Sequence, residues 1–478
     1  MIAKNFNSKT HLSILILQII LFAVLFVCNN QSIITQAQTN TSTTKTFNEI
    51  VDHEDTINIG KIKFEKELRE CNISSALATI ENYNIIDSIY YLAKEQSLEN
   101  MLNSYKEILI TQTNNYIKNQ DYTSVSGLLN SKQKYFQDDQ IICGLIRLNS
   151  RLQNEQNLVD YNGDIFHLTF NTLMAFPEKA LSENNNLSGL YDENKITSNE
   201  FKAILTELYK NNYILIDIFD VIDKETNNTK QLKLPQGKKP IVMSFDNVSY
   251  KSNYQNLGEI DKIIIDRNNN IASYTTKKSI QDRVAYDNEF ILVLESFVKA
   301  HPDFSYNNAK GIIFFSGENG ILGYNTNHKN ASSKYESKRA SEVIKKLKSL
   351  NWRFGCNNYS YTNESNLSDM EFAKQLSLWN QEIKSIIGDT ILYAYPYGQH
   401  DSSDTSKQEL LQTNGYRVFF VNNDNLTLES FGGITTMSRF EINGKTLREK
   451  SDKLSPLFDC EKVYDHQNRT VSFYNTNQ

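Results

Sequence analysis

Residues 242–250 read VMSFDNVSY, and this stretch decides the fold. Apart from Ser244, the residues from Pro240 to Phe245 are apolar, and Asp246 and Asn247 follow directly. A short apolar run that stops at polar residues is typical of a buried strand. In sheets of parallel strands, chemistry gathers where the strands end. We therefore expect a site after Phe245.

Similar runs continue along the chain, separated by amphipathic stretches. Further strands are expected at 164–170, 213–221, 262–267, 311–317, 352–356, 390–398 and 417–423. Helices are expected at 198–212, 289–304, 335–351, 367–387 and 406–416. Strands that alternate with helices at this spacing predict an α/β fold, with a parallel sheet covered by helices. Their number fits a barrel or a partial barrel.

Two more strand ends carry polar or aromatic residues. The run WRFGCNNYSY (352–361) ends with Asn357, Asn358 and Tyr361. The run YAYPYGQHD (393–401) ends in a turn formed by Tyr395, Pro396, Tyr397 and Gly398. We expect both segments to meet Asp246 at one mouth of the barrel.

In order and spacing, the three segments resemble the motifs of the polysaccharide deacetylase family, also called the NodB-homology family or carbohydrate esterase family 4. Residues 200–218 and 301–324 add to the resemblance. The resemblance covers about residues 158–450 and implies a distorted seven-stranded (β/α) barrel. It also implies hydrolysis of acetamide groups by a zinc-type ion, held by one Asp and two His, with a second Asp as the base.

The sequence departs from the family pattern at the metal ligands. Asp246 keeps the position of the catalytic base, but Asn247, Asn357 and Tyr361 occupy the three ligand positions, and Asn358 follows the first of the two His positions. Neutral amides bind zinc poorly, and tyrosine binds it only as a phenolate. We therefore expect no metal and no other cofactor. The late family motif, which supplies an acid His, corresponds to 432–447, where Arg439 stands and no His occurs.

The resemblance implies a groove for sugar rings. We assign substrate contacts to the substituted ligand positions, to the turn after the third strand end and to one late arginine: Asn247, Asn357, Tyr361, Tyr395, Pro396, Tyr397, Gly398 and Arg439. Tyr250 and Tyr359 are further candidates for stacking on sugar, with core packing as the alternative. His167 could point into the mouth or be structural. His400 and Asp401 could approach Asp246 and rebuild a metal site, or lie in a solvated loop.

The first third of the chain has a different character. Residues 1–37 contain the apolar run 12–28 after Lys4 and Lys9, which predicts a signal peptide or a membrane anchor and a secreted or membrane-anchored protein. Residues 38–57 are expected to form a linker, and 58–155 a helical domain that serves as a spacer or binds protein. Residues 451–478 are expected to form a tail.

Three functions stay open. The first is a catalytically impaired member that binds a polysaccharide of the cell envelope. The second is an active hydrolase that removes acetyl groups from such a polysaccharide. The third is a structural or interaction protein of the envelope. The net charge of −6 argues against a nucleic-acid partner, which requires a basic surface.

Overall fold

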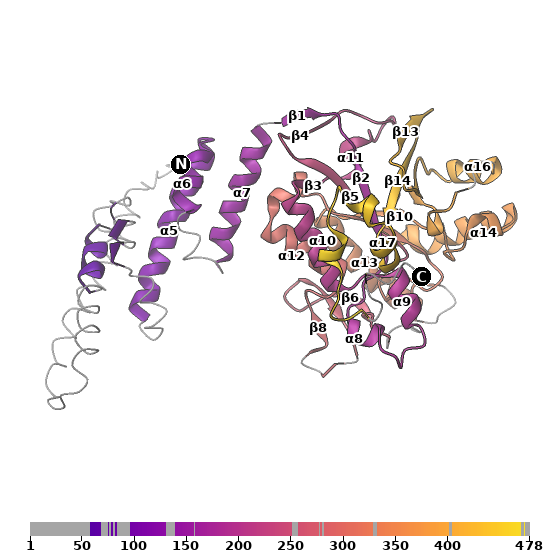
Figure 1. The fold of residues 1–478 in the computed structure, drawn as a ribbon, viewed down its shortest axis with the longest axis horizontal. Helices are drawn as coiled ribbons and strands as arrows, with labels where there is room; N and C mark the ends of the chain where they lie inside the picture. The colour runs from indigo at the N-terminus through magenta and orange to yellow at the C-terminus, as the bar shows by residue number, and fades with distance from the viewer. Residues whose placement is uncertain are drawn as a thin grey trace, which may run out of the picture. The chain divides into compact units, whose positions relative to one another are not determined.

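The computed structural model describes residues 58–67, 75, 78–79, 82–83, 96–130, 139–156, 158–250, 257–276, 278–279, 282–327, 332–400, 404–469 and 473 (Figure 1). The chain divides into two compact units, residues 1–119 with 127–137 and residues 120–126 with 138–478. The expected leader and linker lie outside the described residues. None of the described helices is long and apolar enough to cross a bilayer.

The stretch expected to be helical contains helices wherever the structure describes it. Residues 58–67 are helical, and α5 spans Gln96–Lys118, α6 Tyr122–Asn130 and α7 Gln140–Gln156. In the first unit, the rings of Phe64 and Tyr105 pack edge to face with centroids 5.8 Å apart. Helix α7 belongs to the second unit, where it contacts β4 (Leu232–Pro235) and α12 (Phe290–Ala300).

Seven parallel strands close a barrel within the described part of the second unit, which confirms the predicted fold. In spatial order they are β2 (Phe166–Phe170), β5 (Lys239–Phe245), β9 (Ile312–Phe315), β10 (Arg353–Cys356), β11 (Leu392–Ala394), β12 (Val418–Asn422) and β14 (Ile434–Glu441). The ring closes because β14 pairs with β12 on one side and with β2 on the other. All seven pairings are parallel.

Two expected strands were wrong in detail, and one strand was not expected. The run 213–221 forms only β3 (Tyr213–Leu215), because Asp217 caps the short helix α11 (Ile218–Val221) and ends the strand. The run 262–267 forms β6 (Lys262–Ile265) outside the barrel. The closing strand β14 was not predicted, because its sequence ITTMSRFE lacks a continuous apolar run.

The remaining strands lie outside the ring. β1 (Leu158–Tyr161) pairs with β4, and β13 (Leu428–Phe431) pairs with β14, both antiparallel. β6, β7 (Ile271–Tyr274) and β8 (Val284–Ala285) form a small antiparallel sheet.

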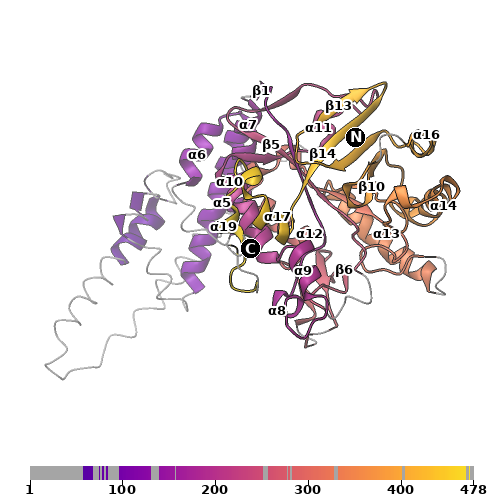
Figure 2. The ribbon, with the colours of Figure 1, turned by 45° about the vertical axis from the view of Figure 1, so that its right-hand side comes forward.

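Helices surround the ring. Figures 1 and 2 show α10, α12 and α13 outside the strands. The helices not yet given are α8 (Pro177–Ala180), α9 (Ser188–Asn194), α10 (Ser198–Lys210), α13 (Ser333–Ser349), α14 (Asp369–Trp379), α15 (Ser385–Ile387), α16 (Thr405–Thr413), α17 (Gly444–Glu449), α18 (Ser451–Leu454) and α19 (Cys460–Val463). Several begin with capping boxes, such as Thr197 with Glu200 at α10 and Ser368 with Glu371 at α14.

The core has two layers because strand side chains alternate between the two faces. Outward residues pack on the helices, as where the rings of Phe245 and Phe290 stack with centroids 3.8 Å apart. Inward residues such as Val242, Phe314 and Phe420 fill the barrel together with residues of α11 and β4. A residue two positions after the last inward residue of a strand therefore points into the mouth of the barrel.

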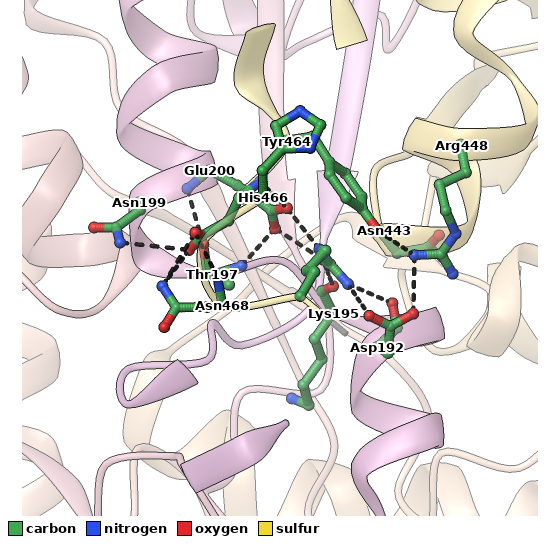
Figure 3. A network of polar contacts seen from close by, with 12 residues as sticks. Asp192, Lys195, Thr197, Asn199, Glu200, Asn443, Arg448, Tyr464, His466 and Asn468 are labelled. Atoms are coloured by element: carbon green, nitrogen blue, oxygen red, sulfur yellow. Dashed lines mark hydrogen bonds and ion pairs between the residues drawn. The ribbon is translucent and has the colours of Figure 1, made fainter. Parts of the chain in front are cut away.

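The segment expected to be a tail contains α18 and α19, which contact α17, and α19 also contacts α10. Its anchor is Arg469, whose side chain is fully buried. Figure 3 shows the polar network around Asp192 and Glu200, to which this side chain belongs. The Arg469 guanidinium contacts the Glu200 carboxylate at 2.6 and 2.8 Å and Asp192 Oδ1 at 2.9 Å. It also donates to the backbone carbonyls of Asp192 and Lys195. Residues 451–469 are thus part of the barrel unit.

Candidate functional site

Asp246 lies at the carboxyl end of β5 and is bound by Arg439 from β14. The two guanidinium nitrogens Nη1 and Nη2 donate to the two carboxylate oxygens at 2.8 and 2.9 Å. Arg439 is 0% exposed and Asp246 is 5% exposed. Both side chains point inward, since Ser244 and Asp246 continue the inward face of Val242. The pair is a bidentate, buried ion pair, and it occupies both oxygens of the residue at the base position.

His167 lies below this pair and is structural. Its Nε2 is 2.8 Å from Ser244 Oγ, and its ring meets the ring of Phe420 edge to face at 5.1 Å. Burial, and then the nearby positive charge of Arg439, hold the pKa of His167 well below its usual range. The imidazole is therefore neutral and continues a hydrogen-bonded path from Arg439 Nη1 through Ser244 Oγ, 3.3 Å away.

Asn247 and Asn357 occupy expected ligand positions, and their side chains join strand ends. Asn357 Oδ1 accepts from the backbone N–H of Asn247 at 3.0 Å, and Asn357 Nδ2 donates to the carbonyl of Ala394 at 2.8 Å. Asn247 Oδ1 accepts from Ser316 Oγ at 2.6 Å. These bonds connect the ends of β5, β9, β10 and β11.

A zinc centre does not fit this donor set. Zinc is held by thiolate, imidazole or carboxylate ligands. Here two of the three positions are neutral amides whose oxygens already accept hydrogen bonds from the protein. The carboxylate of Asp246 is bound by Arg439. Among the residues that the structure describes, no three His, Cys, Asp or Glu side chains lie close enough together to hold a metal ion.

Tyr361 and Tyr397 form an aromatic pair at the rim. Their ring centroids are 4.8 Å apart, and Tyr397 is 56% exposed. Burial, and then the negative charges of Asp246 and Glu441, raise the pKa of Tyr361 well above its usual value. The phenol therefore keeps its proton at neutral pH.

The turn that carries Tyr397 is held in one conformation. Pro396 and Gly398 are buried, Tyr397 has φ 57°, and Gly398 has φ 65°. A Cβ at Gly398 would lie 2.0 Å from Asn422 Cγ, so only glycine fits there. The positive φ of Asn247, Asn358, Tyr361 and Tyr397 places four such residues at the strand ends, where strained backbone marks functional sites in many proteins.

Three of the tyrosines considered for stacking on sugar are instead core residues. Tyr250, Tyr359 and Tyr395 are 3%, 5% and 1% exposed. Tyr359 donates to Glu382 at 2.6 Å, and Tyr395 donates to Gln408 at 2.9 Å. Tyr395 points away from the barrel axis because its neighbour Ala394 faces inward.

His400 does not join Asp246. Its ring lies 4.3 Å from the outward-pointing ring of Tyr395, whereas Asp246 points into the barrel. Asp401 lies outside the described residues. The rebuilt metal site considered from Asp246, His400 and Asp401 therefore has no support in the described residues.

Glu441 also lies at the barrel mouth, although the sequence did not indicate it as a site residue. It follows Arg439 by two residues on β14, so it points into the same mouth. Asn422 Nδ2 donates to Glu441 Oε2 at 3.3 Å. Burial raises the pKa of Glu441, and the charge of Asp246 adds to the shift. Recognition of 434–441 as a strand would have placed Arg439 and Glu441 on one face.

Comparison of the sequence with protein-family models and with curated proteins gives no match. Among solved structures, the chain is similar to the Streptococcus pyogenes deacetylase PplD in complex with acetate, with 14% identity and a TM-score of 0.33 over 61% of this chain and 95% of that chain. It is also similar to a de-N-acetylase from Aggregatibacter actinomycetemcomitans, with 12% identity and a TM-score of 0.33 over 60% of this chain and 97% of that chain.

Proposed function

We propose that this protein is a polysaccharide-deacetylase-like protein that binds a glycan of the cell envelope and does not carry out zinc-dependent deacetylation. The observation that carries the proposal is that the residues at the barrel mouth are already hydrogen-bonded to other parts of the protein. The oxygens of Asn247 and Asn357 accept from the protein, and Asp246 is bound on both oxygens by Arg439. Metal-assisted hydrolysis requires open ligand positions and a base free to take a proton from water.

The rim supplies a surface for sugar. The ring of Tyr397 is more than half exposed and contacts the ring of Tyr361. The negative charges of Asp246 and Glu441 act on the hydroxyl of Tyr361. Tyrosine rings offer an apolar face with a hydroxyl at one end, which suits a sugar ring with apolar faces and polar edges. Carboxylate and amide oxygens accept more than one hydrogen bond each, so the groups beside the two rings still offer acceptors to sugar hydroxyls.

The location of the protein is part of the same proposal. The apolar run 12–28 after two lysines supports export or anchoring, and an envelope glycan is the polymer that an exported protein meets. The helical region before the barrel is then a spacer or a protein-binding module. The acidic net charge gives no support for a nucleic-acid partner.

Zinc titration by calorimetry on the full chain tests the central claim. The matched variant carries Asn247→Asp, Asn357→His and Tyr361→His together, which restores the donor types of the family pattern. We expect no zinc binding by the natural chain and measurable binding by the triple variant, with circular dichroism showing that both are folded. If the triple variant is unfolded, the natural chain alone decides the question.

Tight zinc binding by the natural chain, with acetate release from an acetylated oligosaccharide that a chelator abolishes, would establish the hydrolase and overturn the proposal. Acetate release that persists with the chelator would establish a metal-free hydrolase. If the natural chain neither releases acetate nor binds envelope glycans in a pull-down, the role as an envelope interaction protein replaces glycan binding.

A further inference from the structure

Helix α13 is strongly basic, although the protein as a whole is acidic. Its sequence SKYESKRASEVIKKLKS holds six basic and two acidic residues, which gives a charge of +4 in a chain with a net charge of −6. The helix covers the outside of the barrel (Figures 1 and 2). Its apolar side is buried in the core, so its charged side is free to meet a partner.

Four of the basic residues form a single row along the helix: Lys334, Lys338, Lys345 and Lys348. At about 3.6 residues per turn, these four positions lie within an arc of about 80° on the helix surface. At about 1.5 Å per residue, the row is about 21 Å long. All four residues are exposed. We call this set the lysine row.

The lysine row runs along the barrel wall from the mouth to the opposite end. Helix α13 connects β9 to β10, and these two strands are parallel neighbours in the ring. The helix must therefore run in the opposite direction to both strands. Lys334 lies at the end near the mouth, and Lys348 lies at the end where β10 begins.

The acidic residues of the helix are already paired with other cations. Glu342 Oε2 lies 3.9 Å from Arg339 Nε, and Glu336 Oε2 lies 3.9 Å from Lys262 Nζ. Within the part of the chain that the structure describes, no carboxylate lies within 4.0 Å of an ammonium group of the lysine row. The row therefore presents four positive charges to the solvent.

The lysine row also lowers the stability of its own helix. Lys334 and Lys338 are four residues apart, and Lys345 and Lys348 are three residues apart, so each pair brings two like charges together. Lys334 lies in the first turn, where the helix dipole disfavours a cation. A bound polyanion would remove both penalties, and the described residues contain nothing else that does so.

We propose that the lysine row binds an extended anionic polymer of the cell envelope with phosphodiester repeats, such as a polyol-phosphate or sugar-phosphate chain. The envelope location rests on the proposed function, but the lysine row shares no residue with the rim and adds a second binding surface. Lysine acts on a phosphate as a point charge, whereas planar carboxylates are best held by the two-pronged guanidinium of arginine. The row contains only lysines.

A linear chain fits the lysine row better than a flat membrane does. A helix that lies in a membrane surface inserts apolar side chains beside its charges, whereas Ser341 is the residue that lies between the lysines of the row. A flat anionic surface would also approach Glu342 and Asp389, whose side chains are 51% and 93% exposed. The row has no aromatic side chain on which the bases of a nucleic acid would stack.

The test is calorimetric titration of the full chain with a poly(glycerol phosphate) chain at low and at moderate salt. We expect binding that weakens at least tenfold between about 50 and 200 mM salt, because four neutralised phosphates on a flexible chain would give about fiftyfold. Polygalacturonate, a carboxylate polymer, should bind more weakly at the same salt concentration.

The decisive variant replaces the four lysines of the row together: Lys334→Gln, Lys338→Gln, Lys345→Gln and Lys348→Gln. Glutamine keeps the helix propensity of lysine, so the variant should lose at least tenfold in affinity while its thermal stability does not fall. The pair Lys345→Gln with Lys348→Gln should halve the salt dependence, and it decides the question if the fourfold variant is unfolded by circular dichroism.

The matched control makes the same change of charge at four exposed lysines outside α13: Lys299→Gln, Lys445→Gln, Lys453→Gln and Lys462→Gln. It should bind the polymer within about threefold of the natural chain, since its lysine row is intact. An equal loss in the two fourfold variants would show that only net charge matters, and it would overturn the inference.

Three further results would also overturn it. They are no binding of poly(glycerol phosphate) by the natural chain, equally tight binding of polygalacturonate, and tighter binding of phosphatidylglycerol vesicles or single-stranded DNA. A neutral N-acetylglucosamine tetramer tests the rim separately, and the fourfold row variant should bind it as the natural chain does. Failure of the tetramer to bind would count against glycan binding at the rim and leave the lysine row in place.

Discussion

Arg439 binds Asp246 through two hydrogen bonds of 2.8 and 2.9 Å, although 193 positions separate the two residues in the sequence. The pair connects β5 with β14, which are separated in the ring by β2. The contact that would position Asp246 as a catalytic base therefore also joins the end of β5 to β14, the strand that closes the barrel.

Arg439→Met should destabilise the protein by about 3–5 kcal/mol, because it leaves the Asp246 carboxylate buried without its partner. Urea denaturation followed by circular dichroism measures the change. The double variant Asp246→Asn with Arg439→Met removes both charges and should recover part of the loss. A double variant less stable than Arg439→Met would show that the pair does not act as a coupled unit.

Gly398→Ala should displace the turn that carries Tyr397, because the new Cβ would meet Asn422 Cγ at 2.0 Å. We expect weaker glycan binding together with a loss of stability. Gly415→Ala is the control, since Gly415 also has positive φ, at 96°, but its Cβ would meet nothing within 4 Å. That change should cost only about 1 kcal/mol of backbone strain and leave binding unchanged. Equal effects of both changes on binding would contradict the role of the turn.

Arg469→Met should destabilise the barrel unit by about 3–5 kcal/mol, because Glu200 and Asp192 lose a buried cation (Figure 3). Thermal unfolding of the full chain measures the effect. Lys462→Met is the matched control, since the Lys462 side chain is 67% exposed and its ion pair with Asp459 is a surface pair. Similar small effects of the two changes would show that the C-terminal segment is dispensable for the fold.

The free energy of unfolding should fall as pH rises from about 5 to 8, because Glu289 holds a proton in the folded protein. This residue is 0% exposed, and burial raises its pKa from 4.5 to about 8. The folded state therefore holds a proton that the unfolded state has released, and the stability that this proton contributes is lost as pH rises through the folded pKa. Glu364 adds a change of the same sign.

Glu289→Gln should reduce this slope in urea denaturation series at several pH values. The slope for one such group is at most about 1.4 kcal/mol per pH unit. The control Asp287→Asn removes an exposed carboxylate two residues away and should leave the slope unchanged. An unchanged slope in Glu289→Gln would show that Glu289 is ionised in the folded protein.

The sequence by itself determined the class of the fold and the three strand ends of the candidate site, which follow β5, β10 and β11. The runs of β5 and β9 are short and mostly apolar, as expected of parallel strands whose two faces are both covered. The change from apolar to polar after Phe245 located Asp246 and Asn247 at a strand end. Such local signals can be recognised without knowing which strands lie next to one another in the sheet.

Only the tertiary structure decided what those residues contact. Strand β14 mixes polar and apolar residues because its inward face carries Arg439 and Glu441, so its role in closing the barrel had no local signal. The burial of Tyr395 and the exposure of Tyr397 follow from which face of the chain meets α16, and two tyrosines two positions apart in one motif look alike in a sequence. Ion pairs such as Arg439 with Asp246 and Arg469 with Glu200 join residues far apart in the chain, because closing the barrel brings together strands that the sequence keeps apart.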